Sequence, residues 1–229
     1  MKNCIVLSGQ YRSFDRTCDS IKQFIETNDL DVYCHLWSTD QREIDNVNDK
    51  LNPKQFVYHD FAEYSDLFES IESRILKNNP KGPNQDKLAA NASMNYSRRV
   101  AYSLVPQNTY DAIIYCRYDN VLGNMLLNKQ PDTIITPSEE SYNLISDIFA
   151  YMPSPMADSY FLYPNYEHLH STTWETEFLD WLRNVKKYPE QDIQTHIHTR
   201  YCPHLMLMRN IIMNGNNFVI SDLPVRILR

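Results

Sequence analysis

Short, mostly apolar runs alternate with longer segments of helical periodicity along the first half of the chain. The apolar runs predict buried strands at residues 4–7, 31–37, 55–58 and 112–116. Apolar residues three or four positions apart predict helices at residues 15–25, 64–76 and 88–105. Because strands and helices alternate, we expect an α/β fold with a mostly parallel sheet and helices on both of its faces.

The second half of the chain has a less regular pattern. It predicts strands at residues 133–136 and 148–152, helices at residues 173–184 and 201–214, and a pair of strands at the C-terminus. Residues 78–85 combine Asn, Pro and Gly and are predicted to form a loop. Since no internal repeat interrupts the pattern, we expect one domain over residues 1–229.

The composition excludes two common nucleotide-binding motifs. The chain of 229 residues has four glycines, and no two of them lie within ten residues of each other. A G-x-G-x-x-G turn and a G-x-x-x-x-G-K-[ST] loop both need closely spaced glycines, so neither is present. The net charge of −7, from 29 acidic and 22 basic residues, also argues against nucleic-acid binding through overall charge.

The cysteines and the N-terminal residues indicate a cytoplasmic location. Five cysteines without a C-x-x-C pair are typical of reduced thiols. The N-terminal apolar run has four residues, whereas a signal peptide needs about seven to fifteen and a membrane span about eighteen. We therefore expect a cytoplasmic protein with no membrane span.

Polar residues follow the first predicted strand, at the position where open α/β sheets bind ligands. These residues are Ser8, Gly9, Gln10 and Arg12. Glycine lets a backbone approach a ligand closely, and arginine offers a forked donor to phosphate. An ordinary strand-to-helix turn with a solvated arginine accounts for the same residues.

The predicted strand at residues 112–116 runs directly into Arg117, Asp119 and Asn120. Carboxylate and amide oxygens suit Mg²⁺ or Mn²⁺, and the arginine would neutralise phosphates bound to the same ion. A turn capped by Asp or Asn is the alternative. We expect this strand to be the parallel neighbour of residues 4–7, so that Arg12 and Asp119 face one crevice.

Several other polar residues are candidates for the same pocket. Asp147 precedes an apolar run and offers a second carboxylate, and Asp158 follows a Pro-Ser-Pro loop. His35 and Trp37 end another predicted strand, although a core histidine beside a packed tryptophan is the simpler explanation. Three histidines resemble a zinc site: His196, His198 and His204. Neither a cysteine pair nor an H-E-x-x-H motif accompanies them.

These residues fall into motifs that match a known family in order. They are Ser-Gly-Gln-x-Arg at residues 8–12, Asp-Val-x-x-His-x-Trp at 31–37, Met-x-Tyr at 94–96, Tyr-Asp-x-x-Ile-x-x-Arg-x-Asp at 110–119, and Asp147 ahead of a short apolar strand with a downstream loop at 156–160. The chain resembles the nucleotide-sugar glycosyltransferases of GT-A type found in bacterial surface-polysaccharide clusters and in phage and giant-virus genomes. It departs from them at Tyr118, where proline is common, and at Pro203-His204, where Pro-Glu is usual.

The resemblance implies a Rossmann-like GT-A sheet, a UDP-sugar donor and a divalent metal, Mn²⁺ or Mg²⁺. It divides the chain into a nucleotide-binding half at about residues 1–125 and an acceptor-side half at about 126–229. It maps the family's metal-binding motif onto Arg117 and Asp119 and places Asp147 at the donor sugar or the acceptor. From the residues we expect Asp119 and Asn120 to bind the metal and, if the transfer inverts the anomeric centre, Asp147 or Asp158 to take the acceptor proton. A retaining transfer would need no such base. The residues expected to bind the nucleotide sugar are Ser8, Gly9, Gln10, Arg12, Trp37, Arg98 and Arg117.

Alternative functions follow from the same residues. The acceptor is expected to be a glycan, but a modified base in phage DNA is an alternative that needs a local basic surface. A non-catalytic nucleotide-sugar or carbohydrate-binding relative would use some of the 16 tyrosines and three tryptophans for stacking. A purely structural protein would leave the polar strand ends without a purpose. The residues available for a basic surface are Arg98, Arg99, Lys186, Lys187, Arg226 and Arg229.

Overall fold

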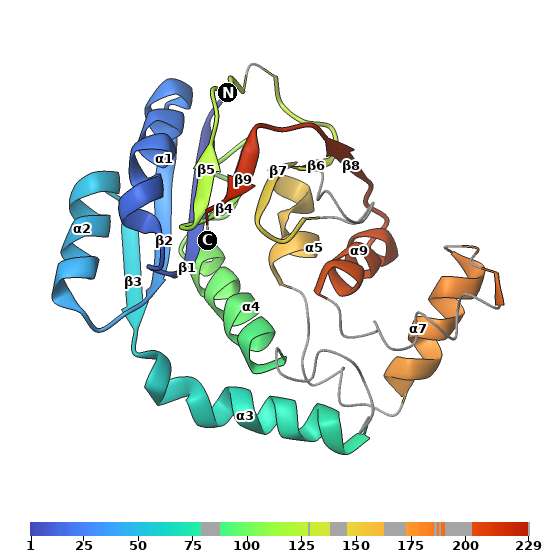
Figure 1. Cartoon of the computed structure of the whole chain (residues 1–229). Coiled ribbons are helices and arrows are strands. Elements are labelled where there is room, and N and C mark those ends of the chain that lie inside the picture. The colour runs from blue at the N-terminus through green and yellow to red at the C-terminus, as the bar shows by residue number, and fades with distance from the viewer. Residues whose placement is uncertain are drawn as a thin grey trace.

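The structure is a computed structural model of the whole chain (Figure 1). It describes residues 1–78, 88–127, 129–137, 146–162, 173–185, 187, 189–190 and 203–228. Most of the loop predicted at residues 78–85 lies outside these ranges, as do His196 and His198.

A seven-stranded, mostly parallel sheet forms the centre of the molecule, in the order β3-β2-β1-β4-β7-β6-β8. The strands from the first half of the chain pair in parallel, whereas β7 runs antiparallel to both of its neighbours. The expected α/β sheet is therefore confirmed. The strands are β1 (Asn3–Gln10), β2 (Asp31–Trp37), β3 (Gln55–His59), β4 (Ala112–Arg117), β6 (Ile134–Pro137), β7 (Phe149–Pro153) and β8 (Phe218–Ser221).

Helices cover both faces of this sheet, as the pattern predicts (Figure 1). On one face lie α1 (Phe14–Asn28) and α2 (Gln41–Leu51). On the other lie α4 (Leu88–Ser103), α5 (Ala157–Phe161), α7 (Thr173–Asn184) and α9 (Pro203–Met213). The helix α3 (Phe61–Asn78) packs beside α4, and a short 3-10 turn, η2 (Ser154–Met156), precedes α5.

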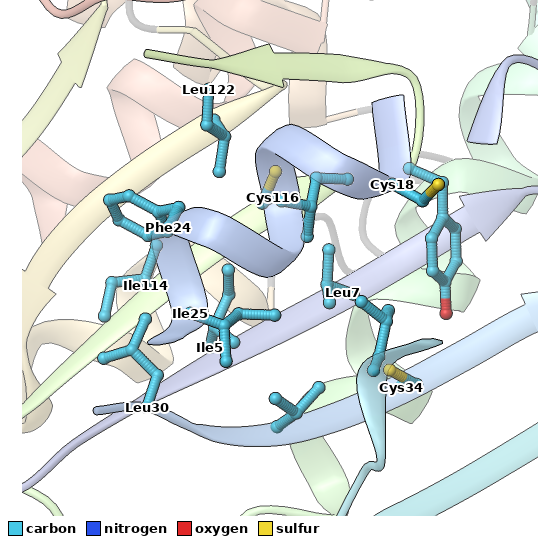
Figure 2. Close-up of a cluster of buried hydrophobic side chains, with 14 of the residues drawn as sticks. Ile5, Leu7, Cys18, Phe24, Ile25, Leu30, Cys34, Ile114, Cys116 and Leu122 are labelled. Atoms are coloured by element: carbon cyan, nitrogen blue, oxygen red, sulfur yellow. The ribbon is translucent and has the colours of Figure 1, made fainter. Parts of the chain in front are cut away.

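The central strand β1 shows why its sequence is continuously apolar. Cys4 and Val6 point into the core below α4, whereas Ile5 and Leu7 point into the core below α1, and all four are fully buried. Figure 2 shows Ile5 and Leu7 facing the α1 side chains. A parallel strand covered on both faces needs apolar residues at every position, so the alternation typical of a half-exposed strand is absent.

The two C-terminal strands are present but do not pair with each other. β8 extends the main sheet beside β6, whereas β9 (Val225–Ile227) pairs with β5 (Asn120–Leu122) in a separate two-stranded sheet. Hydrophobic pattern indicates that a segment is a strand but does not select its partner, so the pairing was not predictable. None of the helices that the structure describes is both long and apolar enough to cross a membrane.

The strand order creates one preferred place for a ligand. From β1 the chain moves through α1 to β2 and then β3 on one side, and it later returns to place β4 on the other side of β1. Helices after β1 and before β4 consequently lie on opposite faces, and open α/β sheets bind ligands outside the carboxyl ends of strands at such a point. We call this region the carboxyl edge.

Candidate functional site

The end of β1 has an unusual backbone that leaves room for a ligand. Gly9 has a φ of +131°, a conformation that other residues rarely adopt, and Arg12 has a φ of +38°. A side-chain carbon added at Gly9 would meet no protein atom within 4 Å. The main chain at Gly9 therefore has a conformation that favours glycine, and the space beside it is open.

The end of β4 brings two arginines onto one carboxylate. Arg117 donates from Nε to Oδ1 of Asp119 at 3.0 Å and from Nη2 to Oδ2 at 2.6 Å. Arg12 Nη1 lies 3.6 Å from the same Oδ2, and Arg12 Nε donates to Gln10 Oε1 at 2.8 Å. We call Arg12, Arg117 and Asp119 the arginine clamp. Its existence confirms that the ends of β1 and β4 meet at one edge.

Burial and charge act in opposite directions on the clamp. Asp119 is 4% exposed, whereas the Arg12 side chain is 54% exposed. Burial disfavours the charged form of Arg117, but the Asp119 carboxylate, with a smaller effect of Asp147, raises the pKa of Arg117 on balance. The clamp itself holds two guanidinium groups and one carboxylate, and Asp147 adds a second carboxylate at the same edge.

Asp147 reaches the same edge from the far side of β4. Because β7 is antiparallel to β4, the residues that precede β7 lie at the carboxyl end of β4. The carbonyl oxygen of Ile148 accepts hydrogen bonds from Arg117 N at 3.2 Å and from Asn120 Nδ2 at 2.7 Å. On the other side of Asp147, the Ser146 carbonyl oxygen accepts a hydrogen bond from the Tyr160 hydroxyl at 3.0 Å. Asp147 is thus held between two anchored residues.

His204, in the first turn of α9, joins Asp147 at this edge. Its Nδ1 lies 3.9 Å from Oδ1 of Asp147, and both side chains are mostly buried. The sequence draws attention to His204 as part of a histidine cluster that resembles a zinc site and as the residue that follows Pro203 where Pro-Glu is usual. No local pattern relates it to Asp147, because the two residues meet only through the packing of α9 near the start of β7.

Ser8 and Arg98 lie in a buried layer beneath the edge. Ser8 Oγ is 3.3 Å from the Tyr115 hydroxyl, and burial raises the pKa of Tyr115 to about 12. The Arg98 guanidinium lies 5.1 Å from the ring centre of Tyr160 and 5.9 Å from that of Tyr115. Arg98 is 2% exposed, so the prediction that it contributes to an exposed basic surface is wrong. Lys186 and Arg229 lie outside the described residues.

Trp37 and His35 belong to a packed aromatic cluster at the end of β2. Trp37 is 5% exposed and stacks on Tyr96 with 5.6 Å between ring centres. His35 Nδ1 bonds Ser97 Oγ at 2.6 Å, and its Nε2 lies 2.9 Å from Nδ1 of His59. Burial, with a smaller effect of His59, lowers the pKa of His35 to about 3. The structure therefore places both residues in the core rather than in contact with open space.

Asp158 is not brought together with the other candidates. It follows the end of β7 that pairs with the start of β4, which is the edge opposite to the carboxyl edge. Its Oδ1 accepts a hydrogen bond from the Tyr102 hydroxyl at 2.7 Å. Of the two predicted catalytic carboxylates, only Asp147 lies beside the arginine clamp.

Of the two side chains expected to bind a divalent cation, Asp119 is already paired with protein groups. Each of its carboxylate oxygens accepts one hydrogen bond from Arg117, so an ion at these oxygens would lie next to a guanidinium group. Asn120 Oδ1 is buried and has no hydrogen-bond partner among the described residues. Among the described residues, no group of three or more His, Cys, Asp or Glu side chains could hold a metal ion. The two guanidinium groups beside the Asp119 carboxylate make it a poor ligand for a divalent cation, because they would repel the ion.

The comparisons with known proteins give low similarity. No protein-family model and no curated protein matches the chain. Among solved structures, mouse xyloside xylosyltransferase 1 in its apo form matches with 11% identity and a TM-score of 0.44, over 96% of this chain and 85% of that one. The apo-form glycosyltransferase GlyE of Streptococcus pneumoniae TIGR4 matches with 9% identity and a TM-score of 0.43, over 96% of this chain and 45% of GlyE.

Proposed function

We propose that this protein is a glycosyltransferase that moves a sugar from a nucleoside diphosphate sugar, with a UDP-sugar as the expected donor, to a hydroxyl of a glycan. The observation that carries the proposal is the arginine clamp at the carboxyl edge, next to the open space at Gly9. Two forked cations at a topological switch point suit a phosphate-bearing ligand. The resemblance of the sequence motifs to those of nucleotide-sugar glycosyltransferases is the reason for expecting that this ligand is a nucleotide sugar.

In the proposed reaction, the leaving diphosphate gains negative charge. The bond between the anomeric carbon and the diphosphate oxygen breaks, and the anomeric carbon forms a bond to the acceptor oxygen. The diphosphate leaves with the electron pair, while the acceptor hydroxyl loses its proton. Arg12 and Arg117 are placed to stabilise the leaving diphosphate, because fixed cations in a partly buried site interact strongly with developing charge.

Asp147 is our candidate for the proton acceptor. It lies at the same edge as the clamp, and an inverting transfer needs a carboxylate to take the proton of the acceptor hydroxyl. His204 Nδ1 lies 3.9 Å from this carboxylate. Asp158 has no such role in this proposal because it lies at the opposite edge.

A panel of nucleoside diphosphate sugars tests the proposal. Each donor is incubated with the protein and a set of simple glycan acceptors, while nucleotide release and product mass are measured. We expect release of the nucleoside diphosphate with at least one UDP-sugar, and its loss in Asp147→Asn. UDP binding without turnover of any donor would favour the non-catalytic binding relative. A folded protein that neither binds UDP nor consumes any donor overturns the proposal.

A further inference from the structure

Asp119 occupies the position where the family resemblance puts a metal ligand, yet its surroundings differ from those of one. Its carboxylate is 4% exposed and is held in a two-bond fork by Arg117, with Arg12 at 3.6 Å. A divalent cation at these oxygens would sit beside two guanidinium groups, of which Arg117 is mostly buried and Arg12 is half exposed. Repulsion from the buried Arg117 would be the stronger of the two, because water screens it poorly.

The same geometry leaves donor groups of Arg117 free for an anion. A guanidinium group carries five N–H donors, and Asp119 uses one on Nε and one on Nη2. The contact of Nη1 is with the Met94 sulfur at 3.8 Å, which is a weak acceptor. Asp119 therefore fixes the plane of the fork, and among the described residues no strong acceptor is bonded to its remaining donors.

Arg12 supplies the second cation from a strained and preorganised position. Its φ of +38° is maintained although it is not a glycine, and Gln10 Oε1 holds its Nε at 2.8 Å. Strained backbone positions persist where the surrounding structure determines them, and they concentrate at ligand sites. Half of the Arg12 side chain is exposed, so a ligand in solution can reach its remaining donors.

We propose that the arginine clamp binds the diphosphate of the donor directly, with Asp119 as a positioning residue for both arginines, and that donor binding does not require a divalent cation. This inference rests on the proposed function, since it concerns the same site and names how that site recognises the donor. It replaces the metal expected from the resemblance with the two guanidinium groups of the chain itself.

Calorimetric binding of UDP, with excess Mn²⁺ and separately with excess chelator, tests the inference. We expect the two dissociation constants of the wild-type protein to agree within about twofold. Arg117→Lys keeps the charge but loses the fork, so UDP affinity should fall about tenfold or more in both conditions. Uridine, which lacks phosphate, should bind wild type and variant equally.

The variant Asp119→Asn distinguishes a role of Asp119 in positioning the arginines from a role as a metal ligand. A positioning carboxylate predicts weaker UDP binding by about tenfold with chelator as well as with Mn²⁺. A metal ligand predicts an effect only when Mn²⁺ is present. Arg183→Ala is the matched control, because Arg183 forms a comparable two-bond fork with Glu190 on an exposed surface, and it should leave UDP affinity unchanged. Melting temperatures confirm that each variant folds.

The outcomes distinguish this inference from the proposed function. UDP binding that appears only with Mn²⁺, together with intact donor turnover, overturns the metal-free clamp and leaves the glycosyltransferase in place. Binding of inorganic pyrophosphate in chelator without binding of UDP supports the clamp and overturns the nucleotide-sugar donor. If neither UDP nor pyrophosphate binds in either condition, both proposals are wrong.

Discussion

At the scale of single residues, the carboxyl edge contains backbone conformations that are strained for most residue types. Gly9 and Arg12 both have positive φ, and they lie on either side of the turn that leaves β1. The first is open to its surroundings, whereas the second extends its guanidinium group over Asp119. These two positions set the local bend of the chain at the carboxyl edge.

Arg12→Ala is expected to weaken UDP binding by about 1–3 kcal/mol, because it removes a charge-assisted contact to phosphate. The melting temperature should change little, since an exposed ion pair contributes at most about 1 kcal/mol. Calorimetric titration with UDP and a thermal melt provide the two measurements. Unchanged UDP affinity in the folded variant would remove Arg12 from the site.

Gly9→Ala is expected to lower the free energy of unfolding by more than about 1 kcal/mol, because alanine is strained at a φ of +131°. No neighbouring atom would clash with the added methyl group, so the cost arises in the backbone alone. Urea unfolding of the two proteins measures it. Equal unfolding midpoints would show that the turn adopts another conformation at little cost.

At the scale of single elements, burial on two faces explains the sequences of β1 and β2. Every residue of β1 from Asn3 to Ser8 is buried, and β2 is buried from Val32 to its end. In β2 this burial includes His35, whose ring contacts α4 through Ser97 and β3 through His59. The element therefore carries a titratable group in the core.

Leu7→Ala is expected to destabilise the protein by about 2–5 kcal/mol, because it leaves a cavity between β1 and α1 (Figure 2). Leu126→Ala serves as the comparison, since Leu126 is 59% exposed and its truncation should change stability by less than about 0.5 kcal/mol. Urea unfolding of both variants checks the difference. Similar losses in the two variants would contradict the packing seen for β1.

His35 is expected to make stability depend on pH below neutrality. Its pKa is about 3 in the folded protein against a usual 6.5, so the unfolded chain binds the extra proton first as pH falls. The stabilisation is complete above about pH 6.5 and is lost toward pH 3, with a slope of up to about 1.4 kcal/mol per pH unit. His35→Gln should remove this part of the slope, which urea unfolding at several pH values measures. An identical slope in the variant would contradict the prediction.

At the scale of the whole molecule, strand order assembles the candidate site from distant segments. Arg12 and Asp119 meet because β1 and β4 are parallel neighbours, and Asp147 joins them because β7 runs in the opposite direction. The clamp therefore comes from the ends of β1 and β4, whereas Asp147 precedes β7 on the other side of β4. This separation predicts that binding and chemistry can be lost independently.

Asp147→Asn is expected to keep UDP affinity while donor turnover with an acceptor falls by about 100-fold or more, because a missing general base removes about that much catalysis. Turnover and calorimetric UDP affinity are measured on the same preparation, with the Arg183→Ala variant as a control for both. Full turnover in Asp147→Asn would exclude this carboxylate as the proton acceptor. Loss of UDP binding would instead move Asp147 to the donor site.

The alternation of strands and helices, and the polar residues at the strand ends, could be predicted from the sequence. Apolar periodicity reflects which faces of an element are buried, and this is a local property that stays visible in one dimension. The bounds of β2 and α7 match the prediction, whereas α9 begins two residues later and ends one residue earlier. Polar residues directly after apolar strands likewise marked Gly9, Arg12, Arg117 and Asp119 as candidates.

Partners and strand directions were decided only by the tertiary structure. A strand buried on both faces has the same apolar pattern whether it runs parallel or antiparallel, so the sequence could not separate Asp147, at the carboxyl edge, from Asp158, at the opposite one. Nor could it show that Arg117 occupies both oxygens of Asp119, that Arg98 is buried, or that His204 lies beside Asp147. Each of these facts depends on contacts between residues far apart in the chain, and local pattern carries no information about such contacts.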